Sequence, residues 1–75
     1  MNKANPTREQ IVSRAKAQLA EINQYFTDVE HWNTGRGIVE GVIDPDPDGS
    51  MLRCKSALEA MLANEERLKR EGRIS

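Results

Sequence analysis

Several residue types on which common structural and catalytic sites depend are nearly absent from this sequence. Its 75 residues include one cysteine, one histidine, one tryptophan, one tyrosine and one phenylalanine. A single cysteine excludes an intrachain disulfide, and one cysteine with one histidine cannot supply the usual ligand pattern of a zinc site. This cysteine content is typical of the reducing cytoplasm, where we expect the protein to reside.

Long apolar runs and a large charge of either sign are absent too. No apolar run approaches the roughly 20 residues that a membrane-spanning helix requires, and the N-terminal residues lack the hydrophobic core of a signal peptide. Eleven basic and twelve acidic residues give a formal net charge of −1. The chain therefore has no general attraction to nucleic acid or to an anionic membrane. We expect it to act away from membranes.

In place of these features, the sequence contains a long apolar stripe with helical spacing. From Val12 to Val29, apolar residues recur in alternating steps of three and four, which keeps their side chains on one face of a helix. Tyr25 and Trp32 lie at the margin of this face and widen it. The pattern predicts one long amphipathic helix over residues 7–34.

Local signals mark both ends of this helix. Thr7 with Gln10 makes a capping-box pattern, and Asn5 before Pro6 offers an alternative start within two residues. At the other end, Gly35 follows the last periodic residue, a position where glycine commonly closes a helix in the left-handed conformation. The residues before the helix, 1–6, are expected to be a flexible lead-in.

A second apolar stripe predicts a helix over residues 50–71, followed by a short tail over residues 72–75. Asp48 or Ser50 is expected to cap the start of this helix. Cys54 falls on the stripe, where we expect it to be a small buried apolar side chain.

Glu65 is the one charged residue that interrupts this second stripe. In one interpretation it sets the register of the two helices through a basic partner such as Lys16. In the other interpretation, it lines a groove for a ligand or a partner protein.

The connection over residues 35–49 is too long for a minimal helical hairpin. Its first half mixes glycine with aliphatic residues and predicts either a short extended segment or an apolar flap over the helix ends. Its second half cannot be helical, because Pro45 and Pro47 each push the preceding residue toward an extended conformation. Since exposed aliphatic side chains are costly, four of them are expected to be at least partly covered: Ile38, Val39, Val42 and Ile43.

Two amphipathic helices and one connection make an all-α helical hairpin, which we assign to a single domain over residues 1–75. Two helices alone rarely cover apolar faces this wide, because each side chain is then shielded from one direction only. We expect two hairpins to pair into a dimeric four-helix bundle, and a higher closed symmetry also satisfies the pattern. The residues assigned to self-association are Val12, Leu19, Ile22, Phe26, Val29, Leu58, Met61 and Leu68.

One short motif suggests a metal site. Asp44, Asp46 and Asp48 alternate with prolines before Gly49, and this run resembles the first half of the calcium loop of EF-hand and dockerin-like proteins. The resemblance covers six residues. At the twelfth loop position, where that family has a bidentate glutamate, this chain has Lys55. The alternative is a rigid acidic turn that caps the next helix, and on this basis we predict no cofactor.

The residues able to carry catalysis are not expected to meet. His31 falls on the solvated face of the first predicted helix, whereas Cys54 falls on the apolar stripe of the second. A nucleophile and its base must come within hydrogen-bond reach, which this register does not allow. The sequence therefore predicts no catalytic residues and no enzymatic activity.

These exclusions leave binding as the expected role. Small all-helical chains of this kind are often regulators, adaptors or inhibitors of other proteins, including chains encoded by phages and mobile elements, an association by type alone. We expect a helical homo-oligomer that binds another protein. The residues assigned to the partner surface are Tyr25, Trp32, Ile38, Val39, Val42 and Ile43.

The alternative function is nucleic-acid binding through basic helix faces. Two basic clusters, one near each end of the chain, would contact phosphates. Acidic residues are interleaved with both clusters, a pattern more typical of a solvated helix face. The clusters are Arg8, Arg14 and Lys16, and Arg67, Lys69, Arg70 and Arg73.

Overall fold

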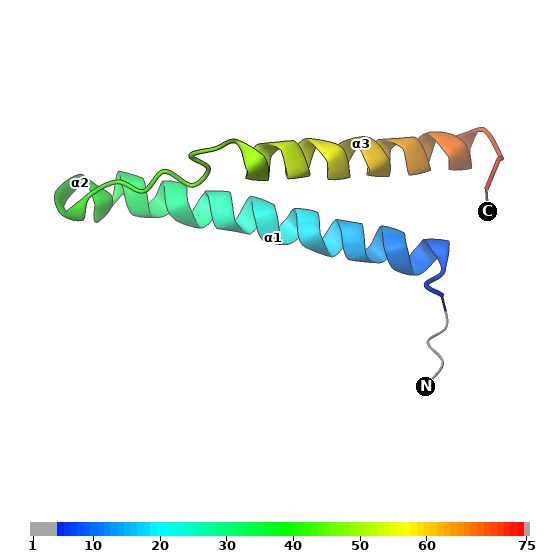
Figure 1. The fold of residues 1–75 in the computed structure, drawn as a ribbon, viewed down its shortest axis with the longest axis horizontal. Coiled ribbons are helices and arrows are strands. Elements are labelled where there is room, and N and C mark those ends of the chain that lie inside the picture. The colour runs from blue at the N-terminus through cyan, green and yellow to red at the C-terminus, as the bar shows by residue number, and fades with distance from the viewer. Residues whose placement is uncertain (1–4, 75) are drawn as a thin grey trace.

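A computed structural model describes residues 5–74, which form two long helices, one short helix and no strand. The predicted all-α class is therefore confirmed. Helix α1 spans Arg8–Thr34, α2 spans Gly37–Glu40 and α3 spans Ser50–Arg70. α1 and α3 run in opposite directions, so the start of α1 and the end of α3 lie at the same end of a hairpin (Figure 1). Within the described residues, none of the helices combines the length and the apolar character that a membrane crossing requires.

α1 begins with a capping box at Thr7. The Thr7 hydroxyl accepts a hydrogen bond from the Gln10 N–H (3.2 Å), and the Gln10 side-chain oxygen accepts one from the Thr7 N–H (2.9 Å). Two of the unpaired N–H groups of the first turn are thereby satisfied. Asn5 and Pro6 precede the helix and are exposed. The rest of the predicted lead-in, residues 1–4, lies outside the described residues, as does residue 75 of the predicted tail.

α1 ends differently from the prediction. Gly35 has a φ of −111°, so it is not left-handed. Its N–H donates to the carbonyl of Trp32 (3.1 Å), a three-residue span that tightens the last turn. The physical reason is that the chain must enter α2 only two residues later, and a left-handed residue would direct it elsewhere.

α3 ends in a Schellman motif. Gly72 adopts the left-handed conformation, with a φ of 72°. The Arg73 N–H donates to the carbonyl of Leu68 (2.9 Å) and the Gly72 N–H to that of Lys69 (3.1 Å). These two bonds satisfy carbonyls that the end of a helix would otherwise leave unpaired.

The hydrophobic core between the long helices is thin. Among the described residues, the buried apolar side chains are Ala15, Ile22 and Val29, spaced seven residues apart on α1, and none belongs to α3. Most other residues of the two stripes are half-buried, because each helix covers its neighbour from one side only, and Cys54 is exposed. All residues assigned to self-association are already buried or half-buried within this single hairpin. The half-buried ones are Val12, Leu19, Phe26, Leu58, Met61 and Leu68.

An ion pair fixes the open ends of the two helices. The guanidinium of Arg8 binds the carboxylate of Glu65 through two nitrogens, with Nε donating to Oε2 at 3.1 Å. The Glu65 side chain is 12% exposed, and this hydrogen bond raises the pKa of Arg8. The basic partner of Glu65 is therefore Arg8 and not Lys16, the example suggested by the sequence. The planar guanidinium group of arginine can donate to both oxygens of a carboxylate. Glu65 thus has a basic partner, as the first interpretation expects, and it also lines a groove at the open end of the hairpin.

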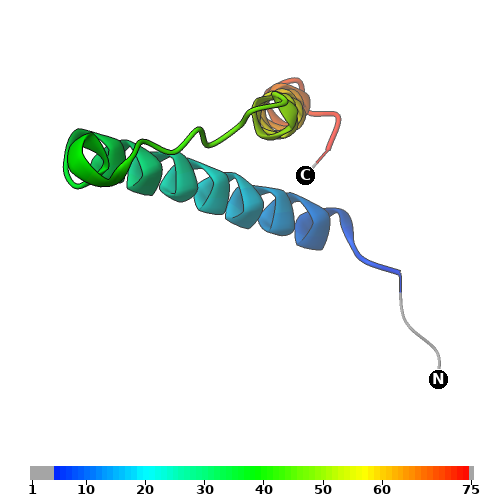
Figure 2. The ribbon, with the colours of Figure 1, turned by 60° about the vertical axis from the view of Figure 1, so that its left-hand side comes forward.

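The hairpin is open and elongated, measuring 52 × 38 × 20 Å. The axes of α1 and α3 are inclined, since Figure 2 looks almost along α3 while α1 crosses the view. The radius of gyration is 17.1 Å, against about 11 Å for a compact chain of this length. The accessible surface is 6146 Å², which exceeds by about 1,500 Å² the area expected for a compact monomer of this mass. A single hairpin therefore leaves more surface open to water than a compact chain would, and its half-buried stripe residues contribute to that surface.

Candidate functional site

The candidate site lies at the closed end of the hairpin, on α2 and the first residues after it. Four aliphatic side chains are exposed there, and we name them the apolar strip: Ile38 (74% exposed), Val39 (88%), Val42 (72%) and Ile43 (45%). The prediction that these residues are partly covered is wrong for Ile38, Val39 and Val42, whereas Ile43 is more than half covered. α2 forms the tip of the hairpin and residues 41–49 return along α1 toward α3, so no described element lies on their outer side (Figure 1).

Polar side chains from the last turns of α1 hold the returning segment by its backbone. The Trp32 Nε1–H donates to the carbonyl of Gly41 (3.0 Å). The Asn33 amide donates to the carbonyl of Ile43 (2.8 Å) and accepts from the N–H of the same residue (2.7 Å). Because the backbone faces α1, the aliphatic side chains of the segment are left exposed. These bonds fix the backbone at Gly41 and Ile43, while Ile38 and Val39 are carried by α2.

Tyr25 holds the same segment one step further along. Its hydroxyl donates to the carbonyl of Pro45 (3.0 Å). Its ring lies against that of Phe26, with the centroids 5.6 Å apart, and remains 39% exposed. Tyr25, which the sequence assigned to a partner surface, therefore supports the connection with its hydroxyl and leaves part of its ring open to solvent.

Trp32 packs against α2. A Cβ atom added to Gly37 would lie 2.9 Å from the Trp32 carbonyl oxygen and 3.1 Å from its Cδ1, so this contact requires glycine. The guanidinium of Arg36 lies 5.9 Å from the centre of the Trp32 ring and also bonds Glu40 (2.8 Å). Trp32 is half-buried by these neighbours. It lies beneath the strip and supports it.

The aspartate-rich turn serves the start of α3. Asp46 accepts hydrogen bonds from the N–H groups of Met51 (2.9 Å) and Leu52 (3.0 Å), one on each carboxylate oxygen. Asp48 accepts from the N–H of Ser50 (3.0 Å), and this bond lowers the pKa of Asp48. The residue at the cap position is Gly49, which has no side chain, so the first turn is capped from the loop by Asp48, one of the two predicted residues, and by Asp46.

These hydrogen bonds engage the aspartates that the sequence suggested as calcium ligands. Both carboxylate oxygens of Asp46 and one of Asp48 face helix N–H groups, and Asp44 accepts from the N–H of Asp46 (3.1 Å). Within residues 5–74 no group of three or more His, Cys, Asp or Glu side chains is arranged to hold a metal ion. The geometry is that of a capping turn.

Two grooves run between α1 and α3. The basic groove, at the open end of the hairpin, is lined by Arg8, Glu9, Val12, Ser13, Lys16, Glu65 and Lys69. The central groove, of about 410 Å³, is largely apolar and is lined by Gln18, Glu21, Ile22, Tyr25, Met51 and Cys54. The prediction that Cys54 is buried is wrong: it is exposed, because the groove that it lines between α1 and α3 is open to solvent.

The structure does not bring the two residues considered for catalysis together. His31 lies in a shallow depression on α1 beside Glu30. Cys54 lies in the central groove on α3. Each is on a different element and faces different neighbours, so no described nucleophile and base form a pair here.

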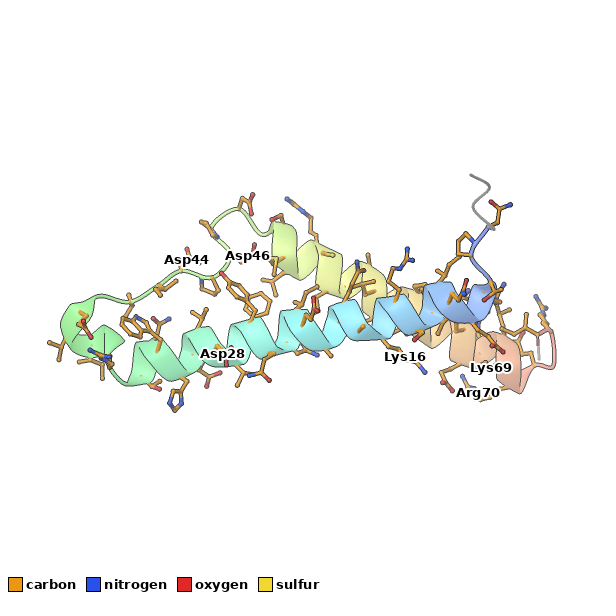
Figure 3. All side chains as sticks on the ribbon, turned by 90° about the horizontal axis from the view of Figure 1, so that it is seen from below. Lys16, Asp28, Asp44, Asp46, Lys69 and Arg70 are labelled. Carbon is orange, nitrogen blue, oxygen red and sulfur yellow. The ribbon has the colours of Figure 1, made fainter. Side chains whose placement is uncertain are left out.

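Charge is divided along the length of the hairpin. The open end, residues 5–20 with 61–74, carries seven basic and four acidic residues. The closed half, residues 21–60, carries three basic and eight acidic residues. Figure 3 shows Lys16, Lys69 and Arg70 at one end and Asp28, Asp44 and Asp46 toward the other. Both basic clusters identified in the sequence thus meet at the open end.

Two residues that position the strip, Asn33 and Gly37, were not assigned a role from the sequence. Asn33 fell at the predicted end of the helix, and Gly37 was one of several glycines in the connection. Their spacing carries a weak signal, because an amide near a helix end followed by a glycine-rich loop often binds loop backbone. The chain matches no family model, no curated protein and no solved structure in the comparisons made, so the function rests on this geometry.

Proposed function

We propose that this chain is a non-enzymatic protein-binding module of the cytoplasm that acts as a helical homo-oligomer and regulates, links or inhibits a partner protein. One observation carries the proposal: the apolar strip is exposed while its backbone is held on α1. Ile38, Val39 and Val42 are each more than 70% exposed, although they lie in an ordered segment. Contiguous exposed apolar side chains of this kind typically mark an interaction surface.

Pre-organisation makes the strip a better binding surface than a flexible loop would be. A loop that orders on binding loses conformational entropy, which reduces the free energy of association. Here the Asn33 and Trp32 hydrogen bonds already order the backbone. Binding of the partner then buries aliphatic area, which stabilises the complex by about 25 cal/mol per Å².

The division of charge favours nucleic-acid binding as a second candidate function. The basic clusters of α1 and α3 converge at the open end, where Lys16 and Lys69 line one groove. Two of the arginines there are engaged by acidic neighbours, Arg8 by Glu65 and Arg73 by Glu71, which reduces the local positive field. Binding to phosphates would weaken steeply as salt rises, whereas binding through the strip would not.

Affinity capture with matched variants tests the proposal. The tagged wild-type chain is compared with Ile38→Asp and Val39→Asp variants, and with Ile11→Asp, an exposed aliphatic residue at the opposite end. We expect the same protein partner to be retained by the wild type and by Ile11→Asp and to be lost from both strip variants, at low and high salt and after nuclease treatment. Equal retention by all four chains would reject the strip. Capture that disappears with nuclease would favour the nucleic-acid function.

A further inference from the structure

We propose that a second copy of this chain docks antiparallel across the central groove, with the two α1 helices running in opposite directions. This rests on the self-association proposed above and adds to it the face and the direction. Four features favour a second copy as the occupant: the open area, the position of the groove, a row of charges along α1 and the division of charge along the hairpin.

The open area is sufficient for a stable dimer. The chain exposes about 1,500 Å² more than a compact monomer of its mass. Each partner in an interface of standard size buries about 800 Å². An apolar side chain is available in the groove itself, since Tyr25 lines it and is 39% exposed.

The central groove lies at the middle of α1. The helix spans Arg8–Thr34, so Glu21, which lines the groove, is its midpoint. A two-fold axis through this point would overlay the two α1 helices along their full length when they are antiparallel. The same patch would serve both copies, as a closed two-fold interface requires.

A row of charged residues on the same side of α1 determines whether the two copies are parallel or antiparallel. Arg14, Glu21 and Asp28 are exposed and spaced seven residues apart, so they form one row along the helix. In a parallel pair each residue faces its own copy, which creates three like-charge contacts. In an antiparallel pair Arg14 faces Asp28 of the second copy twice, and Glu21 alone meets its own copy. Like charges in contact disfavour the parallel pair, so the row selects the antiparallel one.

The charge of the whole hairpin favours the same direction. An antiparallel copy sets the basic open end of one chain over the acidic closed half of the other (Figure 3). Such complementarity raises the rate of encounter and fixes orientation more than it adds affinity, and salt screens it. The affinity itself comes from the apolar side chains of the groove.

Charge reversal tests the direction. The dissociation constant is measured by sedimentation for Arg14→Glu, Asp28→Arg and the double variant. Each single reversal creates two like-charge contacts in the antiparallel dimer, and we expect it to raise the dissociation constant about tenfold at low salt. The double reversal restores both pairs, so its dissociation constant should return to within about twofold of the wild type. Lys16→Glu makes the same change in net charge as Arg14→Glu but lines the basic groove, so it is the matched control for Arg14→Glu and should raise the dissociation constant less.

A distance measurement tests the direction independently. A spin label is placed at position 13 through Ser13→Cys in a Cys54→Ser chain. Ser13 is eight residues from Glu21, so two antiparallel copies would separate the labelled sites by about 24 Å along the helix axis. Parallel copies would hold them about 10 Å apart. The longer distance is the expected result.

The outcomes separate the two proposals. A dimer that shows the short distance, or whose double reversal is no tighter than the single reversals, overturns the antiparallel arrangement and leaves self-association standing. A chain that stays monomeric at every concentration overturns both. Association lost after nuclease treatment also overturns the direct pairing, because the copies would then be linked by nucleic acid.

Discussion

The side chain of Asn33 pairs with the backbone of Ile43 in both directions, donating to its carbonyl at 2.8 Å and accepting from its N–H at 2.7 Å. One side chain near the end of α1 thereby pairs with the returning connection in the way that the backbone of a neighbouring strand would. With the Trp32 bond to Gly41, this pairing determines which way the apolar strip faces. The proposed binding surface depends on it.

Replacing Asn33 with alanine should free the connection. Two hydrogen bonds are lost, and at about 1 kcal/mol each the free energy of unfolding should fall by about 1–2 kcal/mol. Hydrogen exchange at the Ile43 amide is the direct measurement, and we expect its protection to disappear while the amides in the middle of α1 keep theirs. Asn33→Asp, which keeps the acceptor, is the matched control and should retain part of the protection. Unchanged exchange at Ile43 in the alanine variant would contradict the pairing.

Gly37→Ala should displace α2 from Trp32. The new Cβ would lie 2.9 Å from a backbone oxygen, which has little freedom to shift. Overpacking of this kind costs about 1–3 kcal/mol. The single tryptophan reports the change, since its fluorescence should shift toward that of a solvent-exposed indole. Gly35→Ala, whose Cβ would lie 3.3 Å from the His31 carbonyl oxygen, should shift it less. Identical spectra for wild type and Gly37→Ala would contradict the close packing.

Asp46→Ala should loosen the start of α3. The variant leaves the N–H groups of Met51 and Leu52 without their carboxylate partner, and loss of such a cap costs about 1 kcal/mol. Asp44→Ala, which removes one bond within the loop, is the comparison and should cost less. Thermal unfolding followed by circular dichroism measures both. If the two variants melted at the same temperature, the assignment of Asp46 as the cap would be wrong.

Acid should weaken the same helix end through Asp48. The bond from the Ser50 N–H lowers the pKa of Asp48 below its usual value of 3.8. A carboxyl whose pKa is lowered on folding contributes stability above its unfolded pKa and loses it as the pH falls through the folded pKa. Urea denaturation from pH 6 to pH 2 should therefore show a loss below about pH 4. Asp48→Asn should flatten this slope; an equally steep loss in the variant would exclude Asp48 as a source.

The helices were predictable because their signals are local. The capping box needs only Thr7 and Gln10, and Gly72 marks the end of α3 through its own conformation. The spacing of Ala15, Ile22 and Val29 identified the buried face, since a helix fixes which residues share a side.

The site was less predictable because it depends on contacts between distant residues. Nothing in the pattern distinguishes Lys16 from Arg8 as the partner of Glu65, since that choice follows from the inclination of the two helices. Likewise, Asn33 and Ile43 are ten residues apart, and only the path of the connection brings them together. The exposure of Cys54 follows from how little of α3 one neighbouring helix can cover.

The proposed self-association depends on one claim: a single hairpin exposes more apolar surface than a stable monomer would, so the chain functions as a dimer. Sedimentation equilibrium over a wide range of concentrations tests it most directly. We predict a particle of about 17 kDa, twice the 8.5 kDa of one chain, whose melting temperature rises with concentration. A particle of 8.5 kDa that melts cooperatively at one temperature, whatever its concentration, would contradict the claim.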